Sequence, residues 1–193
     1  MRYVALGDSI SIDAYTGVVG GGAASQFAVK VGATGADFQD LTRDGNVTTA
    51  ATIDLQRIQG VPEVITLTIG GNDLLLVGDP VGSILPRIGE IAERLAQFEC
   101  PVILNTVYDP TDGDDAVGES AGISRSLRPE YDTLNAGIKE IAARHAFMLA
   151  DLEQLFHGHG VQAPDTWFVQ VIEPNLAGAT AIANEWHRLL NAG

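Results

Sequence analysis

Short apolar runs alternate with longer amphipathic stretches along this chain, and the alternation predicts the fold class. Runs rich in β-branched and aromatic residues predict five strands, at residues 3–6, 37–43, 64–69, 102–107 and 147–152. Apolar residues three and four positions apart predict helices between and after them, beginning near residues 23, 49, 79, 129 and 174. Strands that alternate with helices are typical of an α/β domain with a parallel sheet.

Two of the predicted strands end in glycine and are followed at once by polar side chains. Residues 3–6 lead into Gly7-Asp8-Ser9, and residues 64–69 lead into Gly70-Gly71-Asn72-Asp73. Ligands of α/β sheets bind at the carboxyl ends of the strands, so we expect the Ser9 hydroxyl and the Asn72 amide to share one cleft. Taken singly, the first motif could be an ordinary polar turn and the second a helix cap.

Together these motifs resemble two blocks of the GDSL or SGNH hydrolase family, the nucleophile block and the Gly-x-Asn-Asp block. The resemblance covers nearly the whole chain and implies a single domain over residues 1–193. It implies a three-layer α/β/α, flavodoxin-like fold whose five-stranded parallel sheet has the order 2-1-3-4-5. The implied activity is serine-dependent hydrolysis of a small-molecule ester, with Ser9 as the nucleophile.

The resemblance also implies how the oxyanion is bound. Its donors would be the Asn72 side chain, the Ser9 N–H and the N–H of a glycine that follows the second strand. Gly45 is our match for that glycine, and Ala50 is the alternative.

The catalytic base departs from the family pattern. The family has an Asp-x-x-His-Pro segment before its last helix, and this chain has Gln170-Val171-Ile172-Glu173-Pro174 there. Gln170 therefore stands where the family has its Asp, and Glu173 stands where it has its His. The usual Ser-His-Asp triad cannot form from this segment, which makes ordinary hydrolase activity the weakest part of the resemblance.

Three alternatives remain for the base. His159, or else His157, could take the Ser9 proton while Glu173 orients the imidazole. Glu173 could take the proton directly, provided that burial raises its pKa above the ordinary value near ~4.3. The two histidines and a carboxylate could instead bind a metal, although His-x-His is a weak signal for one.

Composition excludes several classes of function. The 193 residues carry a net charge of −14, which disfavours nucleic acid and anionic membrane surfaces as partners. No apolar run reaches the ~20 residues of a membrane span. Because strand residues begin at position 3, we expect no signal peptide and a cytoplasmic location. The acidic segment that contains Asp109 and Glu119 is expected to be a long loop, either solvated surface or the rim of an active site.

The sequence thus predicts a GDSL-type esterase or acylhydrolase with an atypical base and with no cofactor or metal. The alternative is a catalytically silent binding module that keeps the fold.

Overall fold

The computed structural model describes residues 1–192. Its main sheet contains β1 (Tyr3–Gly7), β2 (Phe38–Thr42), β3 (Val64–Thr68), β4 (Val102–Asn105) and β5 (Met148–Ala150). The helices are α1 (Ala23–Lys30), α2 (Thr48–Asp54), α3 (Val81–Ala96), α4 (Asp115–Ser120), α5 (Arg128–Arg144), α6 (Leu152–Phe156) and α7 (Leu176–Ala192). Two short strands, β6 (Phe168–Val169) and β7 (Glu173–Pro174), form a separate hairpin.

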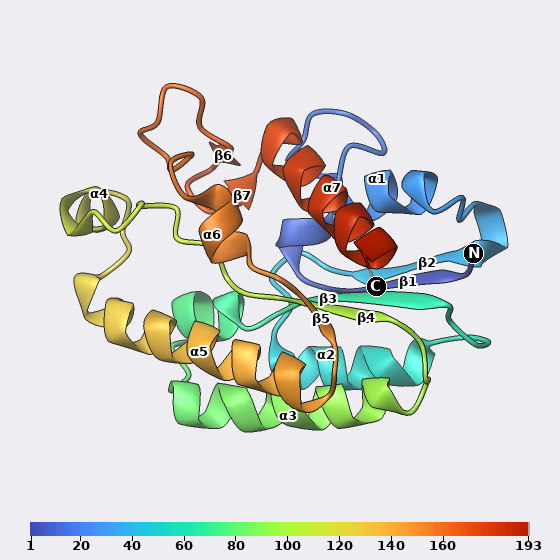
Figure 1. The fold of residues 1–193 in the computed structure, drawn as a ribbon. Coiled ribbons are helices and arrows are strands. Elements are labelled where there is room, and N and C mark those ends of the chain that lie inside the picture. Colours follow the sequence, from blue (N-terminus) through green and yellow to red (C-terminus); the bar gives the residue numbers. More distant parts are fainter. Residues whose placement is uncertain (193) are drawn as a thin grey trace.

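The five strands of the main sheet are parallel and lie in the order β2-β1-β3-β4-β5. Helices α1 and α7 cover one face of this sheet, and α2, α3 and α5 cover the other (Figure 1). The fold class and strand order predicted from the sequence are therefore confirmed.

The alternation of side chains along β1 explains why both faces need a helical layer. Tyr3 and Ala5 pack on the side of α1 and α7, where Trp186 is fully buried. Val4 and Leu6 pack on the opposite side, against the apolar faces of the other layer. A strand that is apolar on both faces is typical of a parallel sheet between two layers of helices.

Gly7 allows the chain to turn sharply at the end of β1. Its φ is +135°, and a Cβ atom there would lie 2.2 Å from the Thr68 carbonyl oxygen. The Asp8 N–H donates to that same oxygen over 3.0 Å. Because no other residue type fits here, the glycine fixes where Ser9 leaves the sheet.

The structure corrects several of the sequence predictions. The strand predicted at residues 147–152 is shorter, and helix α6 begins at Leu152. The segment from Asp109 to Leu127 is not one long loop, because it contains α4 and a 3₁₀ turn at Arg125–Leu127. The β6–β7 hairpin was not predicted. Within residues 1–192, no helix combines the length and the apolar character needed to cross a membrane.

Candidate active site

Ser9 begins a short 3₁₀ turn (Ser9–Ser11) at the carboxyl end of β1. The Asp8 carboxylate caps this turn by accepting a hydrogen bond from the Ile10 N–H over 3.2 Å. The Ser9 N–H donates to no protein acceptor within residues 1–192. It therefore remains free to bind an anion that approaches the Ser9 hydroxyl.

Asn72 follows β3, the strand next to β1, and a hydrogen bond to Asn46 holds its side chain in place. Its Nδ2 donates to the Asn46 carbonyl oxygen over 3.0 Å. Asn46 in turn donates from its own side chain to the Gly7 carbonyl oxygen over 2.9 Å. The Asn72 amide thus keeps one N–H that this bond does not use.

Gly45 lies immediately before Asn46, in a turn that the Asn46 N–H closes onto the Arg43 carbonyl oxygen over 3.2 Å. Its φ of +65° is left-handed, as the third position of a type II turn requires. Throughout the described chain, the Gly45 N–H donates to no protein group. Gly45 and Asn72 are therefore linked through Asn46, and each retains a free N–H.

Asp73 secures the beginning of α2, the helix that follows this turn. Its carboxylate accepts hydrogen bonds from the Thr48 N–H, over 3.0 and 3.1 Å, and from the Thr48 hydroxyl. It also forms an ion pair with Arg87 over 3.3 Å. The Gly-Asn-Asp motif thus anchors the Gly45 turn in addition to presenting Asn72.

Ser9 and Asn72 line one small hollow, which encloses about 350 Å³ of space including its mouth. Tyr108, which follows β4, lines the same hollow, and so does Ile172. The Tyr108 hydroxyl donates to the Ile172 carbonyl oxygen over 2.6 Å. This bond ties the segment that precedes Glu173 to the hollow.

Glu173 lies on β7 and is only 7% exposed. Its Oε2 atom has no hydrogen-bond partner among residues 1–192. Burial raises the pKa of Glu173, the neighbouring Ser9 side chain partly offsets this rise, and the charge of Asp44 adds to it. The Glu173 carboxyl group therefore lies near the Ser9 side chain, and its Oε2 is unpartnered among the described residues.

A second carboxyl group lies beside the same serine. Burial raises the pKa of Asp8 to about 7, an effect that hydrogen bonds from Thr68 and Ile10 oppose and the charge of Glu173 reinforces. The same two carboxylates act on Tyr108, whose pKa is raised first by burial and then by their charges. The surroundings of Ser9 are therefore acidic and poorly hydrated.

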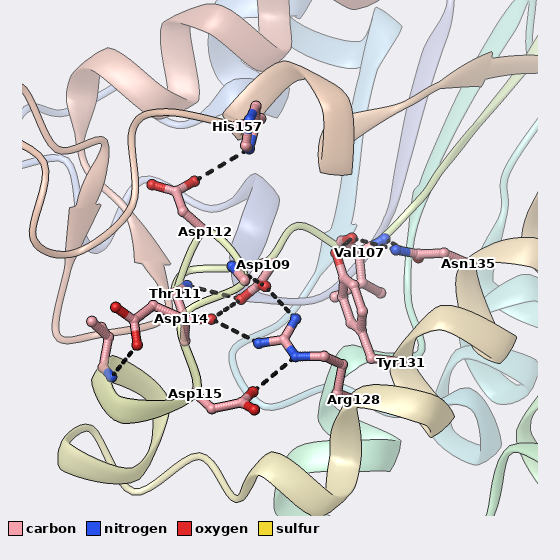
Figure 2. Close-up of polar contacts among 12 residues, drawn as sticks. Val107, Asp109, Thr111, Asp112, Asp114, Asp115, Arg128, Tyr131, Asn135 and His157 are labelled. Carbon is pink, nitrogen blue, oxygen red and sulfur yellow. Dashed lines mark hydrogen bonds and ion pairs between the residues drawn. The ribbon is translucent and has the colours of Figure 1, made fainter.

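The two loop histidines have other neighbours. The His159 ring stacks on Trp167, with 3.8 Å between ring centroids, and its Nδ1 lies 3.0 Å from the Asp165 carboxylate. His157 is 71% exposed and lies 3.8 Å from Asp112 (Figure 2). Neither imidazole lines the hollow or bonds to Ser9 or Glu173. Across residues 1–192, no group of three His, Cys, Asp or Glu side chains could hold a metal ion.

Sequence reasoning missed two residues of the site, Asn46 and Tyr108. Asn46 had a visible signal, because it closes an Asp-Gly-Asn turn directly after the second strand. Tyr108 follows the fourth strand at the same edge of the sheet, so its position was the available signal. Both hold other groups of the site in place.

Comparisons with known proteins identify the family and the fold of the chain. The model of the GDSL-like Lipase/Acylhydrolase family matches residues 5–181 of the chain. No curated protein matches.

Similar solved structures share the fold. One, a member of the lipolytic protein G-D-S-L family from Veillonella parvula, has a TM-score of 0.77 and 18% identity, with 98% of this chain and 97% of that chain covered. A phospholipase A1 from Streptomyces albidoflavus has a TM-score of 0.65 and 21% identity, with 98% of each chain covered. A mutant acetyl-xylooligosaccharide esterase from Geobacillus has a TM-score of 0.73 and 15% identity, with 97% and 93% covered. At these identities the likeness concerns the fold alone.

Proposed function

Because the chain belongs to the GDSL-like lipase/acylhydrolase family, we propose that it is a serine-dependent hydrolase of small-molecule esters in which Glu173 is the base. Membership of the family supports the hydrolase class. The observation that carries the choice of base is the buried carboxyl group of Glu173 beside Ser9, with its Oε2 unpartnered. No other ionisable side chain combines these properties at this serine.

In the proposed reaction Glu173 acts first as base and then as acid, once during acylation of Ser9 and once again during deacylation. The Ser9 Oγ attacks the ester carbonyl carbon while Glu173 accepts the Ser9 proton. The oxyanion accepts hydrogen bonds from the Ser9 N–H, the Gly45 N–H and the Asn72 Nδ2. Protonated Glu173 then donates its proton to the departing alcohol oxygen, which leaves an acyl-serine. Water then attacks the acyl carbon while Glu173 accepts a water proton. The bond from the acyl carbon to the Ser9 Oγ breaks, Glu173 returns the proton to Ser9, and the carboxylic acid leaves.

Burial gives a carboxylate the basicity that this role needs. A glutamate in water has a pKa near ~4.3 and is a poor acceptor for a hydroxyl proton. Removing water penalises the ionised form and so raises the proton affinity of Glu173. A raised pKa of Glu173 lies closer to that of the Ser9 hydroxyl. The free-energy cost of transferring the proton from Ser9 to Glu173 is therefore lower.

The alternative base is His159, oriented by Glu173. For this to operate, the imidazole would have to leave its stack on Trp167 and its pairing with Asp165. The geometry therefore supports direct proton transfer to Glu173 better than it supports a rebuilt Ser-His-Glu triad.

A second candidate function is a binding module that keeps the hollow but does not turn over esters. It is favoured by Gln170 and Glu173, which stand where the family has its Asp and His. Both candidates bind an ester-like ligand, so they differ only in whether Ser9 is activated.

A fluorophosphonate probe separates the two candidates, because it labels only an activated serine and needs no knowledge of the substrate. We expect intact-mass spectrometry to show one label on the wild type and none on Ser9→Ala. Ser11→Ala is the matched control, since Ser11 is buried and its hydroxyl pairs with Thr68 over 2.9 Å. The variants that take up the label should also hydrolyse p-nitrophenyl acetate, and Ser9→Ala should do neither. Absence of both labelling and turnover in the wild type would support the binding module.

A further inference from the structure

The carboxyl groups near Ser9 have no cationic partner. Asp8 lines the hollow, the charge of Glu173 acts on Asp8, and the charge of Asp44 acts on Glu173. Within residues 1–192, no Lys, Arg or His side chain forms an ion pair with any of these three acids. Arg43, which precedes Asp44 in the sequence, pairs with the last residue of α2 over 2.6 Å. The protein therefore leaves the negative charge at this site uncompensated.

Tyr15 and Asp44 form a rim beside this site. Asp44 is exposed, follows β2 and immediately precedes Gly45. Its Oδ2 accepts a hydrogen bond from the Tyr15 hydroxyl over 2.9 Å, which joins the loop after the Ser9 turn to the Gly45 turn. This bond raises the pKa of Tyr15 to about 12, and burial and the charges of Glu173 and Asp44 contribute to the rise. The rim therefore lies within electrostatic reach of Glu173.

The Tyr15 ring offers an aromatic face at this rim. The residue is partly exposed, and its ring stacks on no other aromatic ring of the described chain. The face of an aromatic ring carries a negative potential that attracts cations, and quaternary ammonium groups are bound in this way. An aromatic face beside an exposed carboxylate therefore suits an alkylammonium group.

The buried oxygen of Glu173 supports a cationic ligand independently of the exposed acid. Glu173 is 7% exposed, and its Oε2 has no partner among residues 1–192. An ionised carboxylate that is buried without a partner has a raised free energy. A positive group of the substrate nearby would lower this free energy, and the ionised form is the one that accepts the Ser9 proton.

The proposed reaction directs the alcohol part of the ester towards the rim. Around the attacked carbon, the oxyanion must face the donors of Gly45 and Asn72, and the leaving oxygen must face Glu173 in order to receive its proton. The group attached to the leaving oxygen therefore begins beside Glu173. Asp44 and Tyr15 are the carboxylate and the aromatic side chain that lie within electrostatic reach of this point.

We propose that the rim formed by Tyr15 and Asp44 binds a positively charged alkylammonium group in the alcohol part of the substrate. This inference rests on the proposed function, because the role of Glu173 fixes the direction of the leaving oxygen. The net charge of −14 acts in the same sense, since a negative protein raises the local concentration of cationic ligands.

Two esters of the same shape provide the test. Acetylcholine carries a quaternary ammonium group, and 3,3-dimethylbutyl acetate has a carbon atom in place of that nitrogen. For the wild type, kcat/KM should be about tenfold higher for the cation, as expected when one carboxylate and one aromatic face act on a group that stays partly in water. Asp44→Asn and Tyr15→Leu should each lower this ratio, and the double variant should bring it close to one. Added salt should lower the wild-type ratio as well.

Asp37→Asn is the matched control. Asp37 is exposed and precedes β2, at the opposite end of the strand from Asp44. The substitution removes the same charge from the chain, so the ratio should keep its wild-type value. Three results would overturn the proposal and leave the hydrolase assignment intact: a wild-type ratio near one, a ratio that Asp44→Asn and Tyr15→Leu leave unchanged, or an equal fall in Asp37→Asn. Because both esters are measured on each variant, a general loss of folding or of turnover cancels in the ratio.

A binding experiment tests the rim even if no ester is turned over. In a Ser9→Ala background, choline should bind more tightly than 3,3-dimethylbutan-1-ol in an NMR titration, with sodium chloride holding the ionic strength constant. Adding Asp44→Asn should remove most of the difference. Equal affinity for the two alcohols would overturn the assignment of the rim, whereas a preference for choline without esterase activity in the wild type would overturn only the proposed function.

Discussion

Two buried carboxylates at the carboxyl edge of the sheet have opposite surroundings. Asp73 is 1% exposed, and its oxygens accept hydrogen bonds from Thr48 and pair with Arg87. Glu173 is 7% exposed, and its Oε2 has no partner among the described residues. The two carboxylates are thus similarly buried, but Asp73 is fully hydrogen-bonded and Glu173 is not.

The difference separates a structural role from a chemical one. A buried carboxylate that is fully hydrogen-bonded stabilises the groups that it contacts, and here Asp73 holds the beginning of α2 behind Gly45. A buried carboxylate that lacks a partner raises the free energy of its ionised form, which is a cost for folding and an advantage for a base. The comparison predicts that substitutions at Asp73 affect stability and that substitutions at Glu173 affect turnover.

The largest expected effect is that of Glu173→Gln. The amide keeps the shape of the side chain but accepts no proton, so kcat should fall by roughly 10²–10⁴, the usual contribution of a general base. Because Oε2 has no partner to lose, the melting temperature should stay within a few degrees of the wild type. Steady-state kinetics with p-nitrophenyl esters and a thermal melt measure the two quantities.

The histidines provide the control for that experiment. His159→Ala and His157→Ala should each leave kcat nearly unchanged if Glu173 accepts the proton directly. A loss of several orders of magnitude in His159→Ala, with activity that rises with pH through roughly 6–7, would instead identify an imidazole base and assign Glu173 an orienting role.

Asn72→Ala should have the next largest effect. Removing one donor from an oxyanion hole lowers kcat by about 10²–10³. Among residues 1–192 the side chain loses one protein hydrogen bond, to the Asn46 carbonyl oxygen, so folding should be little affected. If calorimetry showed a large loss of stability while the activity per folded molecule persisted, Asn72 would belong with Asp73 as a structural residue.

Asp73→Asn should show the converse behaviour. The amide cannot accept from Thr48 with both side-chain atoms, and it leaves Asp79 as the ion-pair partner of Arg87, which also donates to the Thr48 hydroxyl. Unfolding should therefore become easier by about 2–3 kcal/mol, as for hydrogen bonds to a charged group. Urea denaturation measures this change. Activity per folded molecule should fall less than in Glu173→Gln, and an equal fall would show that anchoring the Gly45 turn is as important as the base.

The sequence predicted those parts of the molecule whose signals are local. The apolar run at residues 3–6 and the glycine after it are enough to place Ser9 at the end of a strand, because the strand, the turn and the hydroxyl are adjacent in the chain. The same holds for Asn72. The order of the strands came from the family resemblance and is confirmed by the structure.

The surroundings of Glu173 could not be predicted in this way. They depend on the β6–β7 hairpin, whose turn holds Gln170 at φ +51° and Val171 at φ +71°. A β-branched residue rarely adopts a left-handed conformation, so no local propensity indicates this turn. The hairpin is held by distant contacts, including the hydrogen bond from Tyr108 to Ile172. The stacking of His159 on Trp167, eight residues further along the chain, likewise has no local propensity that indicates it.

The surroundings of Asp8 are intermediate between those of Asp73 and those of Glu173. Its carboxylate accepts a hydrogen bond from the Ile10 N–H, yet burial raises its pKa to about 7 from an ordinary value of 3.8. Between these two pH values the folded protein retains a proton that the unfolded chain has released. Its contribution to stability is therefore fully present below pH 3.8 and is lost as the pH rises through 7.

The smallest predicted effect is a change in this pH dependence on Asp8→Asn. The Asn oxygen can still accept from Ile10, but the side chain does not titrate. Urea denaturation at several pH values from 4 to 8 should show a free energy of unfolding that falls less steeply with pH in the variant than in the wild type. The residual slope belongs to the other groups, including Glu173, whose raised pKa acts in the same direction. Parallel profiles would mean that Asp8 is ionised throughout, and its carboxylate would then be a satisfied structural group like that of Asp73.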